Sequence, residues 1–280
     1  MVLEKRVYTS SNYYSFYSIL KESLSGYKNS FYLAKQLAIR DVNAQYRQSI
    51  FGFFWAISPI IINSALWVFL QASGIVQITE TKIPYPLFVV LGSTLWGIIS
   101  ECINLPMVSI NSNRGLISKI NFDKEALITL GLIKLIVNFL LKIIVVLFFM
   151  IYFQVVPSIH FLWFFPLVFC SMIFFVSLGI FIAPIGLLFN DVSRFISLFM
   201  QFLMYVTPVV YVIPKSGLMK TIMFYNPLTY WMTDLKNSMT GFSIENTFFW
   251  IVFLIVTILF TAMALVVYRV SMPIITERMS

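Results

Sequence analysis

The sequence has little charge and few of the residues that bind metals. Asp, Glu, Lys and Arg make up 11% of its 280 residues, whereas a soluble domain carries about 25%. It has one histidine, and its two cysteines, Cys102 and Cys170, lie in apolar stretches, which favours small apolar side chains over a disulfide or a metal site. No GxxxxGK[ST] phosphate loop is present, so any nucleotide would have to be bound by another chain. The start of the chain lacks the pattern of a removable signal peptide.

Hydrophobic residues are abundant instead. They make up 60% of the chain, including 29 Phe, 14 Tyr and 6 Trp. One soluble core cannot hide that much apolar surface, so we predict an all-α integral membrane protein. The formal charge of +8 reflects topology, because Lys and Arg cluster at the ends of apolar segments. We therefore expect membrane lipids as partners and no nucleic acid.

The chain changes abruptly from polar to apolar near residue 50. From Phe51 to Val76 there is no ionisable side chain. Basic residues stay on the cytoplasmic side of a membrane and amphipathic aromatics lie near its boundary. We predict that the chain enters the membrane interface here, with the transition marked by Arg40, Asp41, Arg47 and Trp55.

Six membrane spans are predicted within residues 50–268. They cover residues 53–76, 87–108, 126–153, 161–189, 195–213 and 248–268. Most Lys and Arg fall on one side of this arrangement, which places both termini in the cytoplasm and the protein in the cytoplasmic membrane. Residues 1–27 and 269–280 are expected to be cytoplasmic tails.

Two segments allow more than one interpretation. Residues 28–49 show helical amphipathicity, which suits either a helix in the headgroup plane or a soluble helix packed on a partner. Residues 214–247 are too polar for one span and contain Asn226-Pro227, which favours a turn. This region is either a re-entrant helical pair in the outer leaflet or an extracellular loop with surface helices.

Four stretches of sequence resemble a known family. They are Arg40-Asp41 with Tyr46-Arg47-Gln48-Ser49, Gly52, Trp55 and Pro59; the loop Asn113–Phe122; Asp191 with Gln201 and Thr207-Pro208-Val209-Val210-Tyr211; and Asn226-Pro227-Leu228-Thr229. Their order and spacing resemble the membrane subunits of bacterial ABC exporters of polysaccharides such as O-antigen, capsule and teichoic acid. The chain departs from the family pattern at Gln45, Asn190 and Asp123.

This resemblance implies a transport subunit that does no covalent chemistry itself. Two copies would form a conduit for a lipid-linked polysaccharide, with two separate ATP-binding cassette subunits that bind and hydrolyse ATP. This chain would bind no cofactor. The alternatives are an ABC exporter of a lipid, drug or peptide, a secondary transporter or channel, and a membrane-embedded glycosyl- or acyltransferase. A secondary transporter would need ion-coupling acids inside its spans, and we expect none near the middle of a span. A transferase would need catalytic groups, but Glu101, Asp191 and Asp234 have no histidine or second carboxylate nearby in the sequence.

The basic loop between the second and third spans is the first candidate site. By the resemblance, a short coupling helix here would dock on the ATPase. An amphipathic pattern supports docking, because topogenic charge alone requires no apolar face. The candidate residues are Arg114, Leu116, Ile117, Lys119 and Ile120.

Two further groups are candidates for lining a conduit. Lys134, Asn138 and Lys142 recur every four residues and would form a polar stripe, although Lys134 could snorkel and Lys142 could meet a carbonyl. Aromatic rings near the outer side could stack on sugars or simply form an interfacial belt. These aromatic residues are Tyr205, Tyr211, Tyr225, Tyr230 and Trp231. Asp234 and Glu245 read as solvated outer charges, and His160 as a loop residue.

Overall fold

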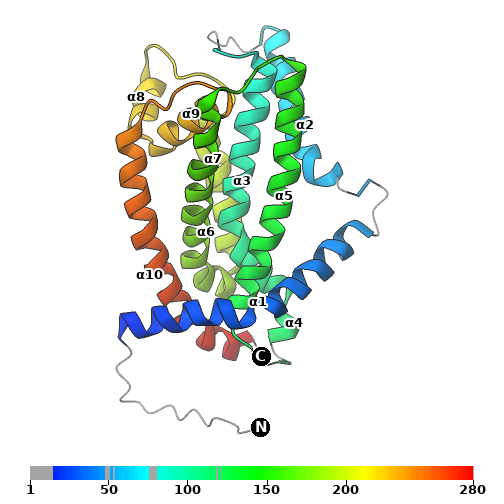
Figure 1. Ribbon diagram of the computed structural model, residues 1–280, viewed down its shortest axis with the longest axis vertical. Coiled ribbons are helices and arrows are strands. Elements are labelled where there is room, and N and C mark those ends of the chain that lie inside the picture. The colour runs from blue at the N-terminus through cyan, green and yellow to red at the C-terminus, as the bar shows by residue number, and fades with distance from the viewer. Residues whose placement is uncertain are drawn as a thin grey trace.

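The protein is a bundle of long helices with one helix lying across its end (Figure 1). The computed structural model describes residues 15–47, 51–52, 54–75, 81–117, 119–120 and 122–279. Helices account for most of these residues, and no strand occurs among them. In order they are α1 (Phe16–Arg47), α2 (Phe54–Ala72), α3 (Tyr85–Ser112), α4 (Arg114–Ile117), α5 (Glu125–Tyr152), η1 (Ile159–Trp163), α6 (Phe164–Leu188), α7 (Asn190–Tyr205), α8 (Leu218–Tyr225), α9 (Pro227–Met239) and α10 (Thr247–Met279). The predicted all-α class is confirmed.

Among the described residues, five segments are long and apolar enough to cross a membrane: Phe54–Ala72, Tyr85–Ser112, Glu125–Tyr152, Ile159–Leu188 and Thr247–Glu277. The predicted fifth span, residues 195–213, coincides only in part with α7. That helix has 16 residues, or about 24 Å, against an apolar bilayer thickness of about 30 Å. The structure thus supports a multi-pass protein with five candidate spans.

Helix α1 begins earlier than predicted. The sequence placed a tail before residue 28, whereas the helix starts at Phe16 and runs along the end of the bundle nearest the C-terminus (Figure 1). It contacts α5 and α10 through small buried residues that recur along one face, including Ser23, Ser30 and Ala34. This face continues the amphipathic pattern towards the N-terminus. Residues 48–49 of the predicted helix lie outside the described residues.

Helix α3 is the centre of the bundle. It contacts α2, α5 and α6, and most of its side chains are buried. Helices α2 and α10, by contrast, expose most of their apolar side chains. Lipid or another protein must cover those surfaces, because exposed apolar area of this extent is unfavourable in water.

The C-terminal helix is also longer than predicted. Residues 269–280 were expected to be a tail, but α10 continues to Met279. Tyr268, Met272 and Ile275 are buried at helical spacing and hold this last part against the bundle. At the opposite end, α8 and α9 meet at Asn226-Pro227, where a turn was predicted.

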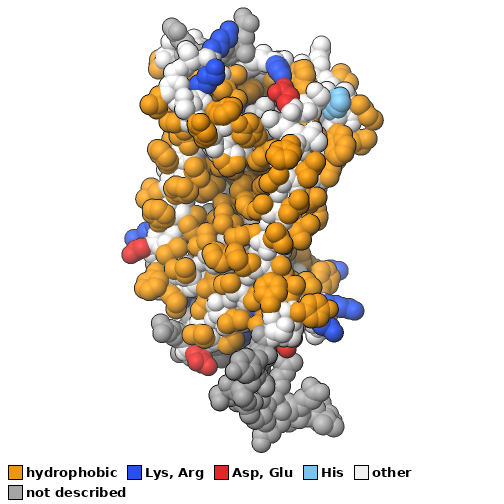
Figure 2. All heavy atoms as spheres, turned by 90° about the vertical axis from the view of Figure 1, so that its left-hand side faces the viewer, with side chains coloured by type: hydrophobic (Ala, Val, Ile, Leu, Met, Phe, Trp, Pro, Cys, Tyr) orange, Lys and Arg blue, Asp and Glu red, His pale blue; other side chains and the backbone are white. Residues whose placement is uncertain are grey.

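The space-filling view shows how polarity is distributed along the bundle. Hydrophobic side chains cover most of the face in Figure 2, while charged side chains gather mainly towards the two ends. That distribution is typical of a protein whose middle lies in the hydrocarbon of a membrane.

Candidate functional site

A buried ion pair joins three helices at the α1 end. Arg269 Nη1 of α10 lies 2.9 Å from a carboxylate oxygen of Glu125 and 3.4 Å from one of Asp123. The Glu125 side chain is fully buried at the start of α5. A Cβ at Gly26 of α1 would lie 3.0 Å from that carboxylate, so α1 can approach because this residue is glycine. Tyr268 adds a hydrogen bond of 2.9 Å from its hydroxyl to the Lys124 carbonyl.

The predicted membrane-boundary residues tie α1 to neighbouring helices. Arg40 donates hydrogen bonds to Asp41 and to Asn113 Oδ1, the latter at 3.1 Å, and Asp41 lies 3.8 Å from Lys134 Nζ of α5. Trp55 is exposed at the start of α2. The Arg47 side chain lies outside the described residues. The polar residues of α1 therefore connect it to the turn after α3 and to α5.

The predicted coupling loop folds as a short helix followed by a turn. Arg114 donates to Asn111 Oδ1 at 3.0 Å and to the Leu187 carbonyl at the end of α6 at 3.4 Å. Leu116 packs on the small cluster under α1, and Ile117 belongs to the main core. Most of the apolar face expected to dock on a partner is thus used inside the chain. Lys119 and Ile120 remain exposed.

The predicted polar stripe on α5 divides into two ion pairs. Lys134 pairs with Asp41 at the α1 end, as described above. Further along, Lys142 Nζ lies 2.5 Å from Glu101 Oε2 of α3, and Asn138 donates to the other oxygen of this carboxylate. Because α3 extends to Ser112, Glu101 lies within the bundle and not near a span end, so the expectation that no acid lies centrally was wrong. A lysine and a glutamate in neighbouring spans were a signal for this pairing.

The aromatic residues predicted to line a conduit do not share one environment. Trp231 is 1% exposed, and its indole N–H donates to Ser171 Oγ at 2.6 Å, so it belongs to the core. Tyr230 donates to the Phe224 carbonyl at 2.6 Å. Tyr205 and Tyr225 are exposed, whereas Tyr211 is partly buried. The Trp231 ring also packs edge-on against Phe175 within this chain, and its role in lining a conduit between two copies stays a prediction.

A backbone turn that follows α7, at the end of the bundle opposite α1, is held by side chains from other elements. Lys236 Nζ of α9 donates to the carbonyls of Pro208 at 2.9 Å and Val209 at 2.7 Å. It also lies 3.4 Å from the centre of the Phe88 ring. A Cβ at Gly92 would lie 1.9 Å from the Val209 oxygen, so only glycine lets α3 pass this close.

Other bonds to the same turn explain two of the sequence motifs. Tyr85 donates from its hydroxyl to the Val210 carbonyl at 3.0 Å. Asn226 Nδ2 donates to the Val206 carbonyl at 2.9 Å and to Thr207 Oγ1 at 3.1 Å. Thr207-Pro208 and Asn226-Pro227 are thus parts of one structure, which we call the outer turn: residues 206–210 with the side chains that bind their carbonyls.

Asp234 was predicted to be a solvated outer charge, but it is buried, as is its neighbour Lys236. Asp234 accepts from the backbone N–H of Glu245 and Asn246 and from the Trp250 indole, at 2.9–3.2 Å. Burial still raises the pKa of this carboxyl above its ordinary value. Glu245 is exposed and pairs with Lys82 at 3.0 Å. Asp234 therefore fixes the connection between α9 and α10.

Residues 32–238 match the family described as ABC-2 type transporter. This chain belongs to that family. The match runs from α1 to α9 and therefore includes the turn around α4, the Glu101–Lys142 pair and the outer turn. The chain is accordingly a membrane transport subunit and not an enzyme.

Curated relatives point in the same direction. The chain is 26% identical over 194 residues to the O-antigen export system permease protein RfbA of Klebsiella pneumoniae. The match covers 68% of this chain and 73% of the Klebsiella protein. The chain is 24% identical over 204 residues to the protein of the same name from Myxococcus xanthus. That match covers 71% of this chain and 77% of the Myxococcus protein. These similarities confirm the resemblance to polysaccharide exporters.

Among the described residues, no group of three His, Cys, Asp or Glu side chains could hold a metal ion.

Proposed function

We propose that this ABC-2 chain is the membrane subunit of an ATP-driven exporter of a lipid-linked polysaccharide such as O-antigen. The similarity to two O-antigen export permeases over about two thirds of the chain supports the substrate class. A separate ATP-binding cassette subunit supplies the energy, and two copies of each subunit assemble the exporter. The protein lies in the cytoplasmic membrane with both termini in the cytoplasm.

The conduit forms between two copies of the chain. Helix α7 provides the fifth of six crossings, extended at its outer end by the outer turn. It exposes Phe195, Leu198 and Phe202 while burying Ile196 and Met200 against the bundle. Helix α2 is exposed in a similar way, so each copy offers apolar helical surface that a second copy can cover.

The observation that carries the proposal is the connection between α3 and α5. It is short and directly joins two of the candidate spans. Its Asn113 accepts a hydrogen bond from Arg40 of α1. Arg114 also ties it to the end of α6. A force applied to this connection would therefore reach α1, α3, α5 and α6 together, which is what a site of ATPase coupling requires.

The exposure of the loop residues supports a narrower contact with the ATPase than the five residues predicted from the sequence. Ile120 is 52% exposed and Lys119 is exposed beside it, whereas Leu116 and Ile117 are packed inside the chain. In our proposal, Lys119 and Ile120 touch the ATPase, and Leu116 and Ile117 hold the connection against α1 and the core.

Site-specific crosslinking tests this arrangement. A photoreactive residue at Ile120, in the chain co-expressed with its ATP-binding subunit, should form an adduct with that subunit. The same residue at Leu218, exposed in α8 at the opposite end, is the matched control and should form none. An Ile120 adduct no more abundant than the Leu218 adduct would contradict the proposal.

A further inference from the structure

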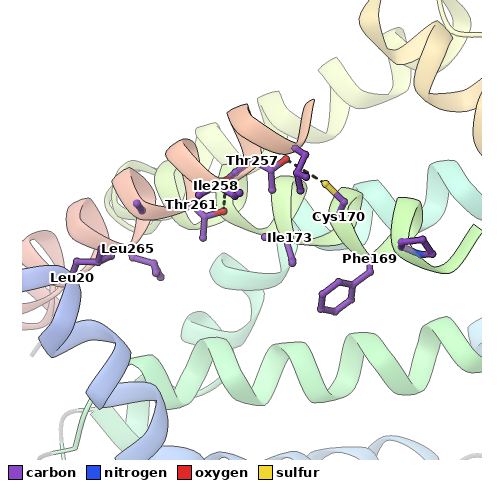
Figure 3. Close-up of a pocket in the computed structure, with 11 residues that line it drawn as sticks. Leu20, Phe169, Cys170, Ile173, Thr257, Ile258, Thr261 and Leu265 are labelled. Atoms are coloured by element: carbon purple, nitrogen blue, oxygen red, sulfur yellow. Dashed lines mark hydrogen bonds between the residues drawn. The ribbon is translucent and has the colours of Figure 1, made fainter. Parts of the chain in front are cut away.

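An apolar groove runs along the outside of the bundle between α6 and α10 and ends at α1. Its volume is about 460 Å³. Figure 3 shows Leu20 of α1 beside Leu265 at one end, with Phe169 and Cys170 of α6 at the other. The α10 part of the lining extends from Leu254 to Leu265, about 16 Å of helical rise. The groove follows the helices, in the direction that an acyl chain takes in a bilayer.

The polar atoms in the groove are already satisfied within the chain. Thr257 donates from its hydroxyl to the Phe253 carbonyl, and Thr261 to the Thr257 carbonyl, both at 2.7 Å. Ser177 shares a hydrogen bond of 2.8 Å with Thr261, and the Cys170 thiol lies 3.7 Å from Thr257 Oγ1. The groove therefore suits an apolar occupant, which needs no hydrogen bonds.

A row of basic residues begins beside the α1 end of the groove. Lys21, Lys28 and Lys35 are spaced seven residues apart, so they share one face of α1 at intervals of about 10 Å. All three are exposed, and none forms an ion pair with another described residue. Lys21 directly follows Leu20, the residue that closes the groove.

An apolar row lies next to the basic row on α1. Tyr17, Leu24 and Phe31 follow the same seven-residue spacing and are 72%, 55% and 53% exposed. The opposite face of α1 is packed on α5 and α10, so both rows point away from the bundle. Apolar and basic rows side by side complement the acyl chains and the phosphate of an anionic lipid.

We infer that α1 and the groove between α6 and α10 form one binding site for an anionic phospholipid of the bilayer. An acyl chain lies in the groove, and the phosphate contacts Lys21 and Lys28. This inference rests on the proposed function as a membrane subunit and on the first of the two interpretations of α1, a helix in the headgroup plane. A partner helix could also use the seven-residue repeat of α1, but it would leave the groove between α6 and α10 empty.

Native mass spectrometry of the full chain tests the headgroup part of the site. The purified protein is titrated with phosphatidylglycerol or with phosphatidylcholine of identical acyl chains, and bound lipids are counted. We expect wild type to prefer phosphatidylglycerol and the double variant Lys21→Gln/Lys28→Gln to lose about tenfold in affinity for it. The matched control, Lys215→Gln/Lys220→Gln, changes two exposed lysines near the opposite end and should bind as wild type does.

The groove is tested with a variant that fills it. Ala262 lines the groove, so Ala262→Phe should reduce binding of both lipids, whereas Val252→Phe, on the same helix outside the lining, should not. If Ala262→Phe does not fold, Leu20→Gln tests the groove independently, because it places a polar amide at the α1 end and should weaken binding of both lipids.

Three results would overturn the inference. They are equal binding of the two lipids by wild type, unchanged phosphatidylglycerol binding by the lysine variant, and displacement of phosphatidylglycerol by equimolar polyprenyl phosphate, which would assign the groove to the substrate lipid. The assay contains neither ATPase nor glycan, so a negative result leaves the proposed export function standing.

Discussion

The two ends of the bundle bury charge in different ways. At the α1 end, Arg269 faces two carboxylates, Glu125 and Asp123. At the other end, Lys236 faces two backbone carbonyls and the ring of Phe88, with no carboxylate within ion-pair distance among the described residues. Breaking the first contact leaves a buried charge without its partner, whereas releasing Lys236 returns a cation to water.

This difference suggests a rigid end and a releasable end. The ion pair holds α1, α5 and α10 in one arrangement, as a platform for a coupling partner would need. The outer turn is held by hydrogen bonds and by the Lys236–Phe88 contact, without an ion pair, and a cation without a counter-charge gains hydration when it leaves. The following predictions test whether the α1 end is more costly to disturb than the outer end.

The largest effect is expected from Arg269→Met. It leaves Glu125 buried and unpaired, which costs about 3–5 kcal/mol of folding free energy. Thermal unfolding of the purified protein should show a strong loss, and adding Glu125→Gln should recover part of it. Arg194→Met, which removes an exposed ion pair, is the matched control and should cost less than about 1 kcal/mol. Equal losses for Arg269→Met and Arg194→Met would refute the rigid-end interpretation.

Breaking the Lys142–Glu101 ion pair should cause an intermediate loss of folding stability. Lys142→Leu leaves Glu101, whose side chain is 27% exposed, without its cation and should cost about 2–3 kcal/mol. Lys142→Leu/Glu101→Leu should recover most of that stability. Measuring export by both variants separates structure from transport, because a stable double variant that still fails to export assigns the pair a role in the path. Additive stability losses would show that the two residues are not coupled.

Lys236→Met should have a smaller effect than Arg269→Met. The thioether fills a similar volume but leaves the Pro208 and Val209 carbonyls without their donor, at a cost of about 1–2 kcal/mol. Unfolding temperature again measures this, with Lys82→Met as the control because Lys82 pairs with Glu245 on the surface. A loss as large as that of Arg269→Met would remove the contrast between the ends.

The smallest expected effect is a pH dependence of the folding stability that Lys236 contributes at the outer turn. Burial lowers the pKa of Lys236 well below its ordinary value of 10.5. Between the lowered pKa and 10.5 the unfolded chain binds more protons than the folded chain, so stability rises with pH in this window. Unfolding temperatures of wild type and Lys236→Met, compared from about pH 6 to about pH 10, should differ increasingly as pH rises. A difference independent of pH would contradict the burial of this cation.

The sequence predicted the helices better than it predicted the surroundings of polar side chains. Long apolar runs located the five candidate spans found among the described residues, because each has at least the roughly 17–25 residues that a membrane-spanning helix needs. Asn226-Pro227 located the junction of α8 and α9, since proline fixes the start of a helix.

The burial of these polar and aromatic side chains was not predicted, and the reason is physical. Asp234, Lys236 and Trp231 lie in a mixed polar segment, which is typical of a surface, yet α9 is inserted under the outer turn. That burial depends on contacts with residues distant in sequence, such as Ser171 and Phe88, which no local pattern contains. The partial burial of Leu116 in α4 depends in the same way on residues distant in sequence, because it packs on a cluster that includes Ala34, Leu37 and Ala38 of α1.

Reconstituted transport is the most direct test of the central claim that this chain is an ATPase-dependent membrane subunit. Proteoliposomes containing the chain, its ATP-binding subunit and a lipid-linked polysaccharide should move the polysaccharide across the membrane only when ATP is hydrolysed. Vesicles with the chain alone should show no movement. Transport of the polysaccharide by the chain without an ATP-binding subunit would contradict the account.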